Sequence, residues 1–226
     1  MSASRFFHLY AYACPAILTP LAFFLWRRHY DGNAQLAAVA LGIPIAHAYL
    51  VPGIGTNVLK MWRFNARLKL GALRPHHGFV FGGATATLSL PIFPAPSAEP
   101  TASSILGVAL GVGALLLFVN WIYDALALRH GVLEVYNQPW ADGAGPWAIA
   151  ADYACWFFGV FGLLYGAGLR FAEGALLAAP SWGEMLAIGA GLVIATAVLP
   201  TLGYICSSYL RHGHSGCRPI ARGADA

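Results

Sequence analysis

The chain has 226 residues, of which 58% are hydrophobic and only 10% are charged, with a formal net charge of +4. This composition is too apolar for an ordinary soluble domain, and it lacks the charge density of a disordered chain or a nucleic-acid-binding domain. Four cysteines are also too few for a disulfide-stabilised scaffold. The sequence predicts an all-α, polytopic helical bundle that is integral to a membrane, forms a single domain over residues 1–226 and has no nucleic-acid partner.

Six apolar segments approach the length of about 20 residues that a helix needs to cross a bilayer. The expected spans are 6–26, 34–53, 78–94, 104–128, 146–169 and 184–209. The third segment is short and contains several Gly, Thr and Ser residues, so it is a candidate for a tilted or re-entrant helix. A total of five or seven spans is therefore an alternative to six.

Basic residues fall unevenly on the two sides of this six-span arrangement. One side has Arg27, Arg28 and Arg170. The other side, which would also hold both termini, has ten: Arg5, Lys60, Arg63, Arg67, Lys69, Arg74, Arg129, Arg211, Arg218 and Arg222. By the positive-inside rule, this asymmetry predicts a multi-pass protein of the cell inner membrane with both termini in the cytoplasm.

Three ionisable residues are expected at a similar depth in three different spans. His47, Asp124 and Asp152 each lie five or six residues inside the predicted cytoplasmic end of a span. A carboxylate inside hydrocarbon costs about 2.5–3.5 kcal/mol near the centre of the bilayer, so we interpret these three as candidate catalytic residues of one cavity. The structural alternative is that Asp124 pairs with Arg129 and that Asp152 favours the positive end of its own helix.

The segment 129–140 is a candidate part of the same site. It mixes His, Glu, Tyr, Asn, Gln and Trp, which is typical of a loop that binds a ligand. The alternative is that its aromatic residues anchor the chain at the level of the lipid headgroups. Together with the end of the preceding span, it supplies two further candidate catalytic residues, His130 and Glu134, and the candidate substrate-binding residues Asn120, Trp121, Tyr136 and Asn137.

The segment 54–77 is predicted to contain an amphipathic interfacial helix from about Asn57 to Leu73. Its basic residues recur at spacings that would form one stripe along such a helix. The simpler interpretation of this stripe is attraction to anionic lipids. The functional interpretation is that Arg63 and Arg67 hold the phosphate or carboxylate headgroup of a substrate.

A metal site or a bound cofactor is not expected. His76 and His77 precede the third span on the same side as the other candidates, but two adjacent helical residues point about 100° apart and cannot both bind one ion. No regularly spaced set of metal ligands and no nucleotide-binding motif occurs. We therefore predict no metal and no cofactor.

These residues favour a small membrane enzyme that performs acid–base chemistry of the isomerase, cyclase or transferase type. Its expected partner is a membrane lipid, an isoprenoid or another apolar small molecule, reached from the cytoplasmic leaflet. One alternative is a transporter for a small solute or a proton, which would need a polar route through the outer halves of the spans, and these halves look nearly wholly apolar. The other is a non-catalytic assembly factor. No feature of the sequence indicates an oligomer.

Overall fold

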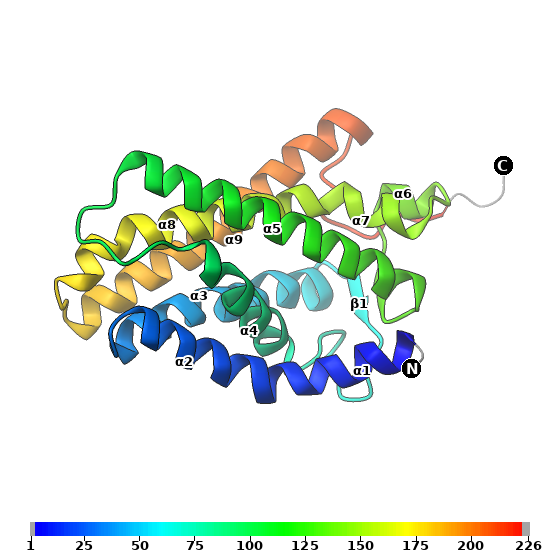
Figure 1. Ribbon diagram of the computed structural model, residues 1–226. Coiled ribbons are helices and arrows are strands. Elements are labelled where there is room, and N and C mark those ends of the chain that lie inside the picture. The colour runs from blue at the N-terminus through cyan, green and yellow to red at the C-terminus, as the bar shows by residue number, and fades with distance from the viewer. Residues whose placement is uncertain (1–2, 223–226) are drawn as a thin grey trace.

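Figure 1 shows the computed structural model, which describes residues 3–222 as a bundle of antiparallel helices. The all-α helical bundle predicted from the sequence is confirmed. In chain order the helical elements are α1 (Ala3–Ala13), η1 (Cys14–Leu18), α2 (Thr19–His29), α3 (Ala34–Gly53), η2 (Ile54–Val58), α4 (His77–Ser89), η3 (Leu90–Ile92), α5 (Ala102–Arg129), α6 (Gln138–Ala141), α7 (Pro146–Ala154), η4 (Cys155–Val160), α8 (Phe161–Leu177) and α9 (Trp182–His212).

Five helices of the described chain are long and apolar enough to cross a membrane, which marks the chain as a membrane protein. Several of them are formed by consecutive elements, with π-helical segments inside the helix, for example η1 between α1 and α2. Their bounds are Arg5–His29, Ala34–Val58, Ala102–Arg129, Pro146–Leu177 and Trp182–His212. They correspond to five of the six expected spans.

The remaining expected span, 78–94, is a short helix. Its α-helical part, α4, has 13 residues, and at a rise of about 1.5 Å per residue it is about 20 Å long, well below the roughly 30 Å of a bilayer core. The chain nevertheless reaches the far end of the bundle at this point. Near the end of α2, Trp26 Nε1 donates a hydrogen bond of 3.0 Å to the carbonyl oxygen of Ala86, and the Trp26 ring packs on Phe93 with 4.9 Å between centroids.

Both ends of the described chain therefore lie at the same end of the bundle (Figure 1). We call this the terminal end, and the opposite one, where α2 leads into α3 and α8 leads into α9, the far end. All ten basic residues that the sequence assigns to one side belong to segments at the terminal end, whereas Arg27, Arg28 and Arg170 belong to helix ends at the far end.

Glycines allow the close approach of α5 and α8 in the middle of the bundle. A Cβ atom on Gly162 would lie only 2.9 Å from the Cα of Gly113 and from the carbonyl oxygen of Val112. One turn further along α8, a Cβ atom on Gly166 would lie 3.1 Å from the carbonyl oxygen of Val108. Lipid tails are as apolar as the side chains, so the hydrophobic effect gives little attraction between helices inside a bilayer. Close backbone-to-backbone packing of this kind holds such helices together instead.

The expected interfacial helix over Asn57–Leu73 is wrong. A short strand, β1 (Trp62–Phe64), stands there and pairs antiparallel with β2 (Leu133–Val135), so that Trp62 lies opposite Val135 and Phe64 opposite Leu133. Lys60 and Gly71 have φ angles of 56° and 66°, which a continuous right-handed helix cannot contain. Pairing with a strand some seventy residues away has replaced a helix that local spacing alone favoured.

The basic stripe predicted for this segment therefore does not form. Arg63 and Arg67 are exposed, on β1 and on the loop that follows it, whereas Arg74 is buried with only 4% of its surface accessible. Arg74 lies against the interior of the bundle, directly before α4. Because it is buried, Arg74 becomes part of the wall of an internal cavity.

Candidate functional site

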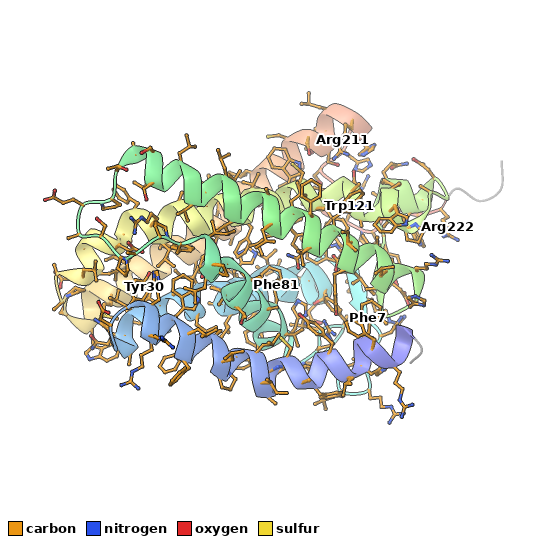
Figure 2. The ribbon with its side chains drawn as sticks, in the orientation of Figure 1. Phe7, Tyr30, Phe81, Trp121, Arg211 and Arg222 are labelled. Carbon is orange, nitrogen blue, oxygen red and sulfur yellow. The ribbon has the colours of Figure 1, made fainter. Side chains whose placement is uncertain are left out.

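A cavity of about 130 Å³ lies in the half of the bundle that is nearer to the terminal end. Helices α1, α3, α4, α5 and the α7–η4 segment contribute to its wall, and the β1–β2 ribbon closes it through Phe64, Leu133 and Val135. Much of the wall is apolar and aromatic. Figure 2 shows one of these residues, Phe81, in the middle of the bundle.

Two lining residues also reach the molecular surface. Leu88 on α4 and Val119 on α5 are 39% and 37% exposed. The short helix α4 packs mainly against α2 and α3 and only weakly against α5. The wall of the cavity therefore reaches the surface of the bundle at these two residues of α4 and α5.

His47 of α3 lies on the cavity wall, as the sequence predicts. It is buried, with 4% of its surface exposed, and its ring lies 4.2 Å from the Phe161 ring and 6.3 Å from the Phe81 ring, centroid to centroid. The Nδ1 atom of His47 is buried and has no hydrogen-bond partner among the described residues. Such an atom is costly in an apolar interior unless something else binds it.

Asp124 of α5 also lines the cavity. Its Oδ2 atom accepts a hydrogen bond of 2.8 Å from the Tyr153 hydroxyl of α7. No ion pair among residues 3–222 includes Asp124. Asn120, one turn earlier on the same helix, lines the cavity too and donates from Nδ2 to the carbonyl oxygen of Leu116 at 2.9 Å. The candidates Asn120 and Asp124, one turn apart on α5, therefore both face the cavity.

Arg74 and His77 belong to the same wall, and sequence reasoning missed both. Arg74 Nη2 donates to Nδ1 of His77 over 3.2 Å, and the Arg74 guanidinium lies 4.8 Å above the centre of the Phe64 ring. The signal that could have found Arg74 was its place immediately before Pro75, just ahead of the apolar helix α4. The spacing to Lys60, Arg63 and Arg67, which we used instead, assumed a helix that does not form.

Asp152 is separate from this cavity, so the prediction that it converges with His47 and Asp124 fails for this residue. Its buried carboxylate forms an ion pair of 2.7 Å with Arg211 of α9. It also accepts from Asn137 Nδ2 at 3.0 Å and lies 3.3 Å from His212 Nε2. The side chain of Asp152 points from α7 toward α9 and not toward the cavity. Its ion pair with Arg211 therefore links α7 to α9.

The other candidates from the 120–140 region do not line the cavity. Asn137 uses its side chain to cap α6 and to bond Asp152, and Trp121 Nε1 donates to the carbonyl oxygen of Trp147 at 3.1 Å. His130 is exposed at the end of α5. The contribution of this region to the cavity is instead apolar, through the β2 residues Leu133 and Val135.

Glu134 forms a surface cluster on the outer side of the β-ribbon. Its carboxylate accepts hydrogen bonds from Asn65 Nδ2 at 2.6 Å and from the Tyr136 hydroxyl. Partial burial by itself would raise the pKa of Glu134, but these two hydrogen bonds, aided by the positive charge of Arg63, hold it below the usual value. Glu134 is therefore ionised at neutral pH, and its contacts stabilise the ribbon.

The far end of the bundle also contains buried polar residues, which corrects the expectation of a nearly wholly apolar outer half. Arg170 and Glu173 of α8 form an ion pair, and the Tyr30 hydroxyl donates to Glu173 Oε1 at 3.3 Å. On α8, the fully buried Phe161 and Tyr165 come between the cavity wall and this cluster, and Phe161 packs against His47. Among the described residues, no hydrogen bond or ion pair links the cluster to a side chain of the cavity wall.

No group of three or more His, Cys, Asp or Glu side chains in the described part of the chain is arranged to hold a metal ion. Comparisons with models of protein families, with curated proteins and with solved structures found no match. No relative of known function therefore indicates the chemistry of the cavity.

Proposed function

We propose that the protein is a multi-pass membrane enzyme that performs acid–base chemistry on an apolar lipid or isoprenoid inside this cavity. The observation that carries the proposal is that His47 and Asp124, from two different helices, line one apolar cavity. A carboxyl group and an imidazole in a water-poor site are suited to exchange a proton with a bound substrate, as an isomerase, a cyclase or a transferase requires.

Each residue has a role in this proposal. Asp124, held by the Tyr153 hydroxyl, donates or accepts the transferred proton. His47 acts as its partner through the ring nitrogen that lacks a hydrogen bond within the protein. The aromatic rings of Phe81 and Phe158 surround the apolar part of the substrate. The surface-exposed Leu88 and Val119 mark the side from which a lipid enters.

A transporter remains the second candidate, favoured only by the buried polar cluster at the far end. Against it, Phe161, Tyr165 and Leu169 are completely buried between that cluster and the cavity. The Tyr165 hydroxyl donates to the carbonyl oxygen of Ala40 at 2.9 Å, which fixes this barrier to α3. A closed apolar layer of this kind favours a pocket over a channel.

Deuterium uptake tests the enzyme proposal directly. We expect purified protein, incubated in D2O with an apolar lipid extract, to convert one lipid species to a product that carries deuterium on carbon, because the site exchanges protons with the substrate. High-resolution mass spectrometry of the extract is the measurement, and protein with Asp124→Asn is the control. If the lipid profile is identical with and without the protein, the isomerase and cyclase forms of the proposal are wrong.

We further propose that the terminal end faces the cytoplasm from the cell inner membrane, on the asymmetry of ten basic residues against three. A reporter that is active only in the cytoplasm should give a signal when fused after residue 226 and none when inserted in the loop 95–101. A reporter that is active only outside the cytoplasm should give the opposite pair. Equal signals at the two sites would contradict the arrangement of the spans. If each reporter gives its signal at the site where none is expected, the terminal end faces away from the cytoplasm and the proposed orientation is wrong.

A further inference from the structure

A second hollow lies next to the cavity at the terminal end and has a different chemical character. It is bounded by α1 and by the loop before α4, and its polar side chains include Asn65, Arg67, Arg74 and His76, which together we call the basic pocket. No Asp or Glu is among the described residues that line it. Arg74 lines both the basic pocket and the main cavity, so the two spaces are neighbours that share this side chain.

The Arg74 guanidinium is a buried positive charge that forms no direct ion pair within the described chain, although the Asp124 carboxylate on the same cavity wall is close enough to interact with it electrostatically. Only 4% of Arg74 is exposed, and none of the ion pairs among residues 3–222 includes it. Its Nη2 atom is occupied by His77, but its Nε atom is buried and without a partner in the described protein. A buried guanidinium that has a donor without a partner and no carboxylate in direct contact would be stabilised further by an anion bound to that donor.

His76 contributes a second unused polar atom to the same pocket. Its Nε2 atom is buried and has no hydrogen-bond partner among the described residues, although its ring packs against Tyr12 at 5.0 Å between centroids. Burial and then the neighbouring charge of Arg74 lower the pKa of His76, so that its ring is neutral at neutral pH and can carry a proton on Nε2. Arg74 Nε and His76 Nε2 are thus two buried potential hydrogen-bond donors that have no acceptor among the described residues.

We propose that the basic pocket binds the anionic headgroup, a phosphate or a carboxylate, of an amphiphile whose apolar chain lies in the main cavity. Guanidinium groups match the oxygens of both anions, and Arg67 at the exposed rim adds a second positive charge. The aromatic wall of the cavity accommodates the chain, and Asp124 lines this cavity but not the basic pocket. This inference names the substrate class of the proposed enzyme and so rests on that proposal, but the binding can be measured without turnover.

The first experiment compares ligands on the full chain in a neutral detergent. The probes are farnesyl phosphate, palmitate, farnesol and inorganic phosphate, and binding is followed by the rise in the thermal unfolding temperature with ligand concentration. We expect at least one of the two anionic amphiphiles to bind at least tenfold more tightly than farnesol, and the better of them identifies the headgroup. Farnesol binding as tightly as both would overturn the inference, and so would inorganic phosphate binding as tightly as either amphiphile.

The second experiment uses variants at the rim of the basic pocket, because Arg74→Gln removes a buried side chain and can prevent folding. Arg67→Gln and His76→Gln should each weaken binding of the preferred anionic amphiphile by about threefold to tenfold and leave farnesol binding unchanged. Arg63→Gln is the matched control, since Arg63 is an exposed arginine on the neighbouring strand that does not line the pocket. If all three variants bind the amphiphile equally well, the basic pocket is not the headgroup site.

The two proposals fail in distinguishable ways. Asp124→Asn should bind the anionic amphiphile at least as tightly as the unmodified protein, because it removes a negative charge near Arg74 and Asp124 does not line the basic pocket. Headgroup preference that depends on Arg67, found without any deuterium uptake, would contradict the acid–base proposal alone. Deuterium uptake on a lipid without headgroup preference would contradict the headgroup inference alone.

Discussion

Asp124→Asn is expected to reduce turnover of the substrate lipid by about 10²–10⁴-fold, the usual contribution of a general acid or base. Asparagine has nearly the same shape and can still accept the hydrogen bond from Tyr153, but it cannot give or take the proton. The fold should not suffer, because a carboxylate without an ion-pair partner becomes a neutral group. The yield of folded protein in membranes should therefore equal or exceed that of the unmodified chain.

The measurement for Asp124→Asn is the rate of deuterium incorporation per amount of folded protein, taken beside the unfolding temperature. Asp142→Asn is the matched control: Asp142 is exposed after α6, accepts one hydrogen bond from Gln138 and is remote from the cavity wall. It should retain full activity. An Asp124→Asn protein that is fully active, or that loses activity only in proportion to lost protein, would show that Asp124 is not the catalytic acid or base.

Glu173→Gln is expected to produce the largest loss of stability, about 3–5 kcal/mol, which is typical when one partner of a buried ion pair is removed. The Arg170 and Glu173 side chains are 5% and 0% exposed. Without the carboxylate, the Arg170 guanidinium would keep its hydrogen bonds to Ser104 and to the carbonyl oxygen of Ala95, but its charge would lie buried and uncompensated. The Tyr30 hydroxyl and the backbone N–H of Ser97, which both donate to Glu173, would also lose their charged acceptor.

Thermal unfolding in detergent measures this loss. Replacing both residues, as Arg170→Met with Glu173→Met, should lower the unfolding temperature less than Glu173→Gln alone, since no charge is then left buried. Glu184→Gln is the matched control, because Glu184 belongs to the capping box at the exposed start of α9 and should have a much smaller effect. Equal effects of Glu173→Gln and Glu184→Gln would contradict a stabilising role for the buried pair.

Asp152 and Arg74 both differ from their predicted placement, and for the same physical reason. His47 and Asp124 line one cavity, in agreement with their similar distances from the ends of their helices, which can be counted along the sequence. Asp152 was assigned a similar depth on the same reasoning, yet its carboxylate binds Arg211, on a helix more than fifty residues further along the chain. Depth is a local property of one helix, whereas the direction in which a side chain points depends on how the helices pack.

Arg74 illustrates the same limit outside the spans. Local spacing placed it on an exposed interfacial helix, but pairing of Trp62–Phe64 with Leu133–Val135 converts this stretch to a strand and a loop. That pairing gains backbone hydrogen bonds that no local pattern encodes. As a result, the loop between β1 and α4 packs against the bundle, and Arg74 is buried beside His77.

By itself, the sequence determined that this is a membrane protein built of long apolar helices, and it identified three polar residues of one cavity, His47, Asn120 and Asp124. These properties follow from composition, helix length and residue spacing, which act along a single segment. The tertiary structure alone decided that Asp152 binds Arg211 instead of facing the cavity, that Arg74 and His76 lie in a basic pocket beside it, and that Arg170 and Glu173 form a buried ion pair at the far end. Each of these depends on contacts between residues far apart in the chain, where packing and the pairing of buried polar groups outweigh local preference.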